Sequence, residues 1–467
     1  MLTYEEALSY IHNLNRFGVK LGLQNILNLL HILGDPHKGI KIIHVAGTNG
    51  KGSTCAMIDS ILRACGFNVG LYTSPYLQVF NERIRVNGKN IPDNDIARLT
   101  QRIQGAIKFM EQKGMHPPTE FEVVTALGFL YFKEQDLDFL ILEVGMGGRL
   151  DATNVVNPLV SVITPISLDH QQYLGGTLKN IAREKCGIIK KGVPVVTSYQ
   201  EPEVMEVIES KCKELNCPLI KVLQEDIDTN VDKINIFYNR KSNDLRGQTF
   251  NLATSGIIYK DLKTTLLGEH QVSNAATAVG AIEALRRVGV KIEKRAVYSG
   301  LINTRWPGRL EILSNNPTVL IDGAHNIAGI RALKKAVNYY FPKNKIILVM
   351  GVLNDKDYED MVKEILSVAD VIITTSPENP RALVSRQLAE VIIKAADKIL
   401  CFDDLKNQDN NNYFIGKVEF YDKKKDIYSV QDLRKAIDIA FHLSSSDDVI
   451  IFTGSLYLIG LVRTAIK

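Results

Sequence analysis

Apolar and polar positions follow two rhythms along the chain, one typical of helices and one typical of buried strands. Near the N-terminus Leu23, Ile26, Leu27 and Leu30 repeat at helical spacing, so the first forty residues are expected to form amphipathic helix. Short apolar runs then alternate with helical stretches, and the predicted strands are Ile40–Ala46, Val69–Thr73, Phe139–Val144, Val160–Thr164 and Val193–Thr197. Strands that are apolar throughout and separated by helices indicate a parallel sheet covered on both faces.

The pattern changes between about Val222 and Leu267. Short, turn-bounded segments that favour β-structure follow one another here: Ile234–Tyr238, Thr249–Ala253 and Gly256–Tyr259. Such segments predict antiparallel or edge strands, added to the parallel sheet. A helical pattern from Ser273 to Val288 closes this part of the chain.

The alternation of strands and helices restarts after Trp306-Pro307-Gly308. Its predicted strands are Thr318–Ile321, Ile346–Gly351, Val371–Thr375 and Val449–Thr453. We therefore expect an α/β protein of two domains, with the boundary near Gly300. Residues 1–300 would hold a P-loop-type, mostly parallel sheet flanked by helices with the β-rich addition, and 301–467 a doubly wound α/β domain. The asparagine-rich stretch Asp403–Lys425 is expected to be a polar loop.

Composition narrows the class of protein. Of 467 residues, 45% are hydrophobic and 23% charged, as in soluble globular proteins. The 56 basic and 52 acidic residues give a formal charge of +4, too small to indicate a nucleic-acid partner.

Targeting signals and cysteines indicate the compartment. Glu5 and Glu6 stand where a signal peptide needs positive charge, and no run reaches the roughly 18 apolar residues of a membrane span. The six cysteines form no CxxC pair. We therefore expect a cytoplasmic protein with reduced thiols and no membrane association.

The strongest local motif is AGTNGKGST, residues 46–54, which a strand enters and a helix leaves. Glycines let backbone N–H groups approach a phosphate, the helix N-terminus adds positive potential, and Lys51 supplies a cation. Ser53 or Thr54 would help to hold Mg²⁺. The usual P-loop pattern is incomplete, because Val45 and Gly52 stand at two of its defining positions. The alternative is a glycine-rich turn with an incidental lysine.

Two further motifs follow predicted strands of the first domain. Glu143 closes one strand and begins the run EVGMGGRLDATN, where a carboxylate beside a phosphate loop is placed to hold Mg²⁺. His170 lies a few residues after another strand and is a plausible ligand or base. Each has a local alternative. Glu143 could be a carboxylate that begins a loop, and His170 a structural histidine. Lys185, in a helical stretch, would ordinarily be a solvated charge.

Polar groups also gather at a helix start and in the second domain. EHQVSNAATA, residues 269–278, offers amide side chains able to pair with a base edge, or simply a helix cap at Ser273 or Asn274. Asp322 ends one strand of the second domain within DGAHN, Thr453-Gly454-Ser455 ends another, and WPGR at 306–309 precedes both. Together they place polar groups on one edge of the second sheet.

These motifs together resemble the Mur-type ligases, and among them the folylpolyglutamate synthase/dihydrofolate synthase family. The matching runs span almost the whole chain in order: GTNGKGS, TSPYL with NERI, LEVGMGGRLDATN, DHQQYLGGTLKNIAREKCGI, HQVSNAATA, WPGRLE and DGAHN. The incomplete P-loop is the form that this family uses.

The resemblance implies a role for each matching position. The ATP-binding positions would be Thr48, Asn49, Gly50, Lys51, Gly52, Ser53, Thr54, Asn274, Arg309 and Asp322. Two Mg²⁺ ions would be held by Ser53, Ser74, Glu143, His170 and a carbamylated Lys185. Lys51, His170 and Lys185 would be catalytic. Folate would be contacted by Arg83 and by Glu120 and Phe121 of the segment Thr119–Glu122. The incoming glutamate would be contacted by His325 and Ser455.

The implied enzyme is a monomeric, ATP-dependent amide ligase that joins L-glutamate to a folate or to dihydropteroate through an acyl phosphate. One alternative is a ligase of the same superfamily acting on a cell-wall precursor, although no extra N-terminal domain precedes the phosphate loop. A P-loop switch protein is a second alternative, but the chain has no Asn-Lys-x-Asp run for guanine. A pure binding module would not require Glu143, His170 and Lys185 together.

Overall fold

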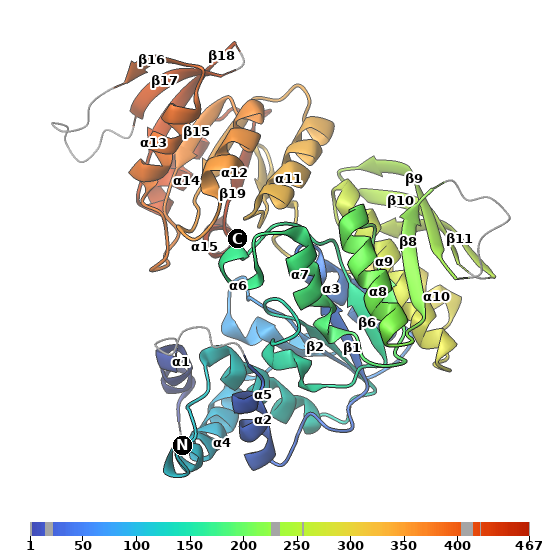
Figure 1. Cartoon of the computed structure of the whole chain (residues 1–467). Coiled ribbons are helices and arrows are strands. Elements are labelled where there is room, and N and C mark those ends of the chain that lie inside the picture. The colour runs from blue at the N-terminus through green and yellow to red at the C-terminus, as the bar shows by residue number, and fades with distance from the viewer. Residues whose placement is uncertain are drawn as a thin grey trace. The chain divides into compact units, whose positions relative to one another are not determined.

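The computed structural model describes residues 2–14, 22–225, 234–254, 256–402, 414–420 and 422–466, and the chain forms two compact units (Figure 1). The first unit consists of Met1–Asn243, Gly247–Thr265 and His270–Arg305. The second consists of Asp244–Arg246, Leu266–Glu269 and Trp306–Lys467.

The first unit is built on a sheet whose described strands number eleven, in the order β11-β10-β9-β8-β7-β6-β1-β5-β2-β3-β4. Strands β9 to β2 of this order pair in parallel, while β3 and β4 at one edge and β10 with β11 at the other pair antiparallel. The predicted parallel sheet with a β-rich addition is therefore confirmed. The strands are β1 Ile42–Ala46, β2 Val69–Tyr72, β3 Ile84–Val86, β4 Lys89–Asn90, β5 Phe139–Glu143, β6 Val160–Ile163, β7 Val195–Thr197, β8 Leu219–Gln224, β9 Ile236–Asp244, β10 Gly247–Thr254 and β11 Ile257–Thr264.

Helices cover both faces of this sheet. On β7, Val195 packs into a cluster with α7 and α8, while Val196 faces α9, where a Cβ on Gly280 would lie 2.7 Å from it. This alternation of sides explains why every residue of the strand is buried. The helices are α1 Tyr4–Asn13, α2 Gln24–Ile32, α3 Lys51–Ala64, α4 Asp93–Gln112, α5 Glu120–Lys133, α6 Gln171–Leu174, α7 Leu178–Lys185, α8 Pro202–Glu214, α9 Glu269–Arg287 and α10 Lys294–Asn303.

The N-terminal helical prediction was too long. Its described residues form two helices, α1 and α2, and the second ends well before residue 40. Gly34 adopts a left-handed φ of +86° and donates to the carbonyl of His31, which turns the chain out of the helix. Leu27, placed in the predicted apolar stripe, is 40% exposed.

The second unit holds a sheet of eight described strands in the order β12-β13-β19-β14-β15-β18-β17-β16. Strands β13 to β18 of this order are parallel and the outer pairs antiparallel, which confirms the predicted α/β architecture. The elements are β12 Glu311–Asn315, β13 Thr318–Ile321, α11 Ile327–Tyr340, β14 Ile346–Met350, α12 Tyr358–Ile365, β15 Val371–Thr374, α13 Ser385–Ala395, β16 Lys398–Phe402, β17 Phe414–Phe420, β18 Lys423–Ser429, α14 Leu433–His442, β19 Val449–Thr453 and α15 Leu456–Ile466.

The predicted polar loop at Asp403–Lys425 is wrong where the structure describes it. Residues 403–413 and 421 lie outside the described part, but β17 and the start of β18 fall within the stretch and pair with each other. Val418 is buried, and Lys425 is only 1% exposed, with its ammonium donating to the carbonyl of Ala369. The lysines and acids around them point outward, so an exposed strand face was mistaken for a loop.

Two expectations concern the chain as a whole. Within the described ranges, no helix is both long enough and apolar enough to cross a membrane. All six cysteines are free thiols, as their scattered positions predicted.

Candidate active site

The loop between β1 and α3 folds back on itself around Lys51. Gly50 caps α3 with a left-handed φ of +83°, and a Cβ at this position would lie 2.4 Å from Oδ1 of Asn274. The Lys51 ammonium donates to the carbonyl oxygens of Gly47 and Thr48, at 3.1 Å each. A cation and the N-terminus of a fourteen-residue helix therefore meet in one turn, as a phosphate site requires.

The two residues between the glycines are tied to the segment that follows β6. The backbone N–H of Thr48 donates to the Pro165 carbonyl at 2.9 Å, and its hydroxyl donates to the Ser167 carbonyl at 3.0 Å. The Asn49 amide donates to the Ser167 hydroxyl at 3.2 Å. These bonds fix the loop against the next strand and define its shape.

Two hydroxyl residues lie in the first turn of α3, directly below the loop. Ser53 is 2% exposed and Thr54 is fully buried, and no hydrogen-bond partner is found for the Thr54 hydroxyl among the described residues. Their oxygens are thus close to the helix N-terminus, the position from which a hydroxyl reaches a metal ion in a phosphate site.

Glu143 ends β5, next to β1 in the sheet, and is 4% exposed. Its Oε2 accepts a hydrogen bond from the backbone N–H of Ser74 at 3.0 Å. Burial raises the pKa of the Cys55 thiol, and the charges of Glu143 and Lys51 both act on it. Glu143 and the Ser74 backbone therefore meet at the carboxyl end of the sheet, and the charges of Glu143 and Lys51 both reach the Cys55 thiol of α3.

Lys185 ends α7 and reaches the phosphate loop. Its ammonium, 5% exposed, donates to the Gly47 carbonyl at 2.8 Å, the same oxygen that accepts from Lys51. Burial lowers the pKa of Lys185 to about 7, and the positive charge of Lys51 acts in the same direction. Asp169 and Asp151 oppose this shift but do not cancel it. The local alternative of a solvated charge is therefore wrong, because Lys185 is a buried amine in contact with the phosphate loop.

His170 is held beside Asp169 in an unusual backbone conformation. Its φ is +51°, its N–H donates to Oδ1 of Asp169 at 2.9 Å, and its Nε2 lies 3.9 Å from the same oxygen. The side chain is 38% exposed. In the described part of the chain no three His, Cys, Asp or Glu side chains are grouped to hold a metal ion. Any metal site here would therefore need hydroxyl, modified lysine or substrate oxygens as well.

The predicted folate-side segment forms the start of α5. The Thr119 hydroxyl accepts from the N–H of Glu122, whose buried carboxylate accepts from Thr119 in return, so both residues cap the helix. Glu120 is partly exposed, and its carboxylate lies 3.0 Å from Nδ1 of His12 on α1. Glu120 and Phe121 are the two partly exposed residues of this segment, so a ligand can reach them, while Thr119 and Glu122 are buried.

Two other predicted substrate residues lie among aromatic rings. The ring of Phe121 covers Gly145, where a Cβ would lie 2.4 Å from its Cζ. The guanidinium of Arg83 lies 5.2 Å from the ring centroid of Tyr76 and 5.7 Å from that of Phe80. This stacking fixes a positive charge beside apolar surface.

In the second unit, Asp322 is buried at the end of β13. Its two carboxylate oxygens accept from the N–H groups of Leu310 and Ala324, at 2.9 Å each. Burial raises the pKa of Asp322, while the Arg309 guanidinium and these N–H groups favour the carboxylate. A Cβ on Gly323 would lie 2.3 Å from Nη1 of Arg309, so the guanidinium lies directly over this glycine. The structure thus brings Arg309 and Asp322 together.

His325 and Ser455 are also brought close within the second unit. His325 directs Nδ1 to the Gly323 carbonyl at 2.9 Å. The N–H of Gly454 donates to the Ala324 carbonyl at 3.1 Å, which joins the segments that carry the two side chains. Ser455 is 2% exposed.

Sequence reasoning missed Asp151 as a part of the site. This buried carboxylate accepts from the N–H of Met146 at 2.9 Å and from the hydroxyl of Thr153 at 2.5 Å, so it shapes the loop that follows Glu143. It lies inside the quoted EVGMGGRLDATN run. An aspartate followed two residues later by threonine was the available signal, since this spacing is typical of a local cap.

Comparisons with known proteins match both parts of the chain to one family. The Mur ligase middle domain matches residues 45–282, and the Mur ligase glutamate ligase domain matches residues 308–456. A dihydrofolate synthase/folylpolyglutamate synthase of Bacillus subtilis is 36% identical over 466 residues, 99% of each chain.

Solved structures extend the likeness to the whole fold. The Mycobacterium tuberculosis folylpolyglutamate synthase complexed with ADP and AMPPCP matches with a TM-score of 0.84 and 32% identity over 98% of both chains. The Escherichia coli enzyme in complex with DHPP and ADP matches with a TM-score of 0.81 and 29% identity, over 100% of this chain and 99% of that one. The chain therefore belongs to the folylpolyglutamate synthase/dihydrofolate synthase family of Mur-type ligases and is an ATP-dependent carbon–nitrogen ligase.

Proposed function

We propose that this enzyme adds L-glutamate to the carboxylate of a folate, and likewise to that of dihydropteroate, through an amide bond. The observation that carries the proposal is the pair of lysines, Lys51 and Lys185, on the Gly47 carbonyl at the entry to a helix N-terminus. This arrangement suits ATP phosphates. The Bacillus subtilis relative is named for both reactions, which supports the double activity.

The chemistry follows from the need to activate a carboxylate in water. A carboxylate oxygen of the pterin substrate attacks the γ-phosphorus of ATP, an O–P bond forms, and ADP leaves with the electrons of the bond that breaks. The amine of glutamate then attacks the carbonyl carbon of the acyl phosphate, phosphate leaves, and the nitrogen loses a proton. Lys51 balances the charge on the transferred phosphoryl oxygens.

Each unit carries its own predicted nucleotide contacts. In the first, the loop from Thr48 to Thr54 would hold the phosphates, and Asn274 beside Gly50 would contact the nucleotide. In the second, Arg309 and Asp322 would do so, and their mutual position supports a shared role.

The donors around the phosphate loop fit Mg²⁺. Ser53, Ser74 and Glu143 offer hydroxyl and carboxylate oxygens, the type that this ion prefers, and the ATP phosphates would complete the set. When bound, Mg²⁺ supplies positive charge that polarises the phosphoryl group. Glu143 is already oriented by its bond to the Ser74 N–H, which supports its role as a ligand.

A second Mg²⁺ would involve Glu143, His170 and Lys185. A lysine ammonium has no lone pair, so Lys185 fits such a site only after its amine has reacted with CO₂ to give a carbamate with oxygen donors. A pKa of about 7 leaves much of this amine neutral near pH 7, which is the form that reacts.

The substrates would be recognised by the other polar and aromatic groups of the two units. Arg83, Glu120 and Phe121 would contact the folate, a flat aromatic molecule with carboxylates. His325 and Ser455 would contact the incoming glutamate. We also propose that residues 1–300 form the ATP-binding and folate domain and 301–467 the glutamate ligase domain of a monomer acting in the cytoplasm.

The proposal is tested by ADP release from the purified enzyme. Each pterin, dihydropteroate or a reduced folate, is supplied with and without L-glutamate. We expect release that depends on both substrates for each pterin. Turnover with folate but none with dihydropteroate would remove the synthase half of the proposal, and ADP release independent of any pterin would remove it altogether.

A further inference from the structure

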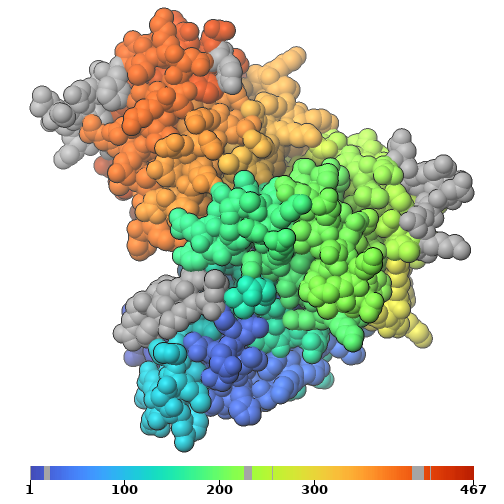
Figure 2. Space-filling model, viewed as in Figure 1, coloured from blue at the N-terminus to red at the C-terminus, as the bar shows by residue number. Residues whose placement is uncertain are grey.

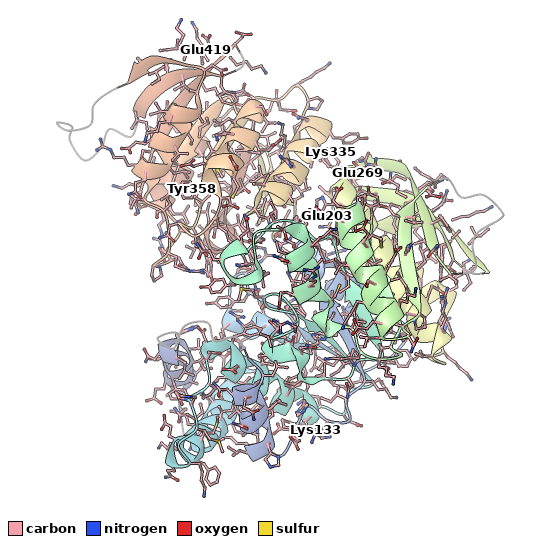
Figure 3. The ribbon with its side chains drawn as sticks, viewed as in Figure 1. Lys133, Glu203, Glu269, Lys335, Tyr358 and Glu419 are labelled. Carbon is pink, nitrogen blue, oxygen red and sulfur yellow. The ribbon has the colours of Figure 1, made fainter. Side chains whose placement is uncertain are left out.

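A cavity of about 820 Å³ lies beside α7 and α8 in the first unit, apart from the residues of the phosphate loop. The two helices pack against each other and form part of the surface that faces the viewer (Figure 2), and α8 starts near Glu203 (Figure 3). The volume falls in the range of small-molecule sites. Six cationic side chains line it: Arg149, Lys179, Arg183, Lys190, Lys191 and Lys211.

The positive charge of this cavity is only partly balanced. Three of its cations form ion pairs: Arg149 with Glu184 at 2.9 Å, Lys179 with Glu206 at 3.2 Å, and Lys211 with Glu214 at 2.7 Å.

Three cations remain without a carboxylate within 4 Å among the described residues: Arg183, Lys190 and Lys191. Arg183 lies on α7, and Lys190 and Lys191 follow the turn after it. The cavity therefore carries a net positive charge that attracts anions.

Lys190 is the most constrained of the three. It is half-buried, its ammonium donates to the Asn154 carbonyl at 3.4 Å, and burial lowers its pKa. A bound carboxylate beside it would favour the charged form and offset the cost of burial.

The floor of the cavity is apolar. Ile189 and Cys186 are buried beneath it, and Val207 and Leu215 of the α8 side complete it. A small inorganic anion would use the cationic rim alone. A flexible chain that carries carboxylates on methylene spacers would use both the rim and the floor.

We propose that this cavity binds the γ-linked oligoglutamate tail of the enzyme's own products. Each added glutamate contributes one α-carboxylate for the rim and two methylene groups for the floor, so the ligand gains contacts as it grows. The proposal rests on the function proposed above, because only that reaction makes such a tail.

The site is distinct from the catalytic residues of the same helix. Lys179, Arg183 and Cys186 share one side of α7 and the turn after it at helical spacing and line the cavity. Lys185 does not line it and instead reaches the Gly47 carbonyl. Tail binding can therefore be measured while the phosphate loop is filled.

The test uses calorimetry with penta-γ-glutamate, which has no pterin, added to the full-length enzyme saturated with ADP. We expect binding by the wild type and binding that is weaker by roughly tenfold or more in the triple variant Arg183→Gln, Lys190→Met, Lys191→Gln. Lys213→Gln, an exposed lysine on α8 that does not line the cavity, is the matched control and should bind as the wild type does.

The results separate this proposal from the proposed function. ADP release with folate and glutamate should persist in the triple variant, so an inactive wild-type enzyme would count against the function and not against the site. Equal binding of penta-γ-glutamate by the triple variant and the wild type would overturn the site. Equally tight binding of inorganic pyrophosphate would overturn the ligand class.

Discussion

The side-chain ammonium groups of Lys51 and Lys185 both donate to the carbonyl oxygen of Gly47, at 3.1 and 2.8 Å. Two cations that share one acceptor repel each other, and the more deeply buried one gives up its proton more easily. Lys185 is that residue, with a pKa lowered to about 7. Of the two lysines that contact the phosphate loop, Lys185 of α7 thus changes its protonation state near neutral pH.

Replacing Lys51 with alanine should abolish turnover while leaving the fold intact. Lys51 is only partly buried and its bonds are to loop carbonyls, so packing loses little. Loss of a preorganised cation at a phosphoryl group should lower kcat by about a hundredfold or more. The measurement is ADP release, with circular dichroism to check folding. Lys89→Ala, at an exposed lysine of β4, is the control, and near-normal kcat in Lys51→Ala would contradict the phosphate-loop assignment.

The folded protein should respond to pH through Lys185. In the unfolded chain the amine keeps its ordinary pKa of 10.5, so between pH 7 and 10.5 the unfolded state binds more protons than the folded state. The free energy of unfolding therefore rises with pH in this window because of Lys185. Below pH 7 the destabilising effect is complete, and above pH 10.5 it is absent.

Lys185→Met removes this effect. The variant's advantage in unfolding free energy over the wild type should be greatest at pH 7 and shrink by up to about 1.4 kcal/mol per pH unit toward pH 10. Urea unfolding of both proteins in CO₂-free buffers at pH 7, 8 and 9 measures the difference. A difference that does not change with pH would mean that the Lys185 amine titrates normally.

The proposed carbamate on Lys185 gives a separate set of outcomes. Activity should fall when CO₂ is stripped from the buffers and return with bicarbonate. Lys185→Ala should be inactive and partly restored by a small carboxylic acid, which supplies the missing oxygen donors. Lys190→Ala should show neither response. An unmodified amine at Lys185 in well-resolved density of a metal-bound enzyme, prepared without CO₂ depletion, would rule the carbamate out.

Gly50 and Asn274 should show a coupled response to substitution. Gly50→Ala introduces a Cβ 2.4 Å from Oδ1 of Asn274 and places alanine at a φ of +83°. We expect loss of stability and a raised KM for ATP, since the loop must shift. Adding Asn274→Ala should restore the stability lost to the overlap, while a cost of about 1 kcal/mol from the backbone conformation remains. Additive effects in a double-mutant cycle would show that the two residues do not touch.

Strands that are buried on both faces were the elements predicted most accurately from the sequence. Strands Thr318–Ile321 and Val449–Thr453 were predicted with the bounds that the structure has, because each is an apolar run with a single threonine at one end, which is typical of strands buried on both faces. Strands exposed on one face were harder to recognise. The β17–β18 pair was missed because Lys417 and Glu419 alternate with buried residues beside a run of asparagines.

The candidate site likewise contains residues that the local sequence reveals and residues that only the fold reveals. Lys51 was recognisable from its glycine-rich loop, whose chemistry depends on neighbours in sequence. Lys185 on local grounds was an ordinary helix lysine, and only its resemblance to the family singled it out. Its burial depends on Gly47, far away in the chain, and no local pattern encodes that contact.

Strand β11 ends the sheet of the first unit among the described strands, and its construction bears on solubility. An unpaired strand edge can recruit a second molecule and start aggregation. Here Lys260 and Lys263 point to solvent, Asp261 takes a φ of +57°, and the pairing with β10 is interrupted by a bulge. Charge and irregular backbone together make this edge a poor template, which would allow the enzyme to accumulate without forming intermolecular sheets.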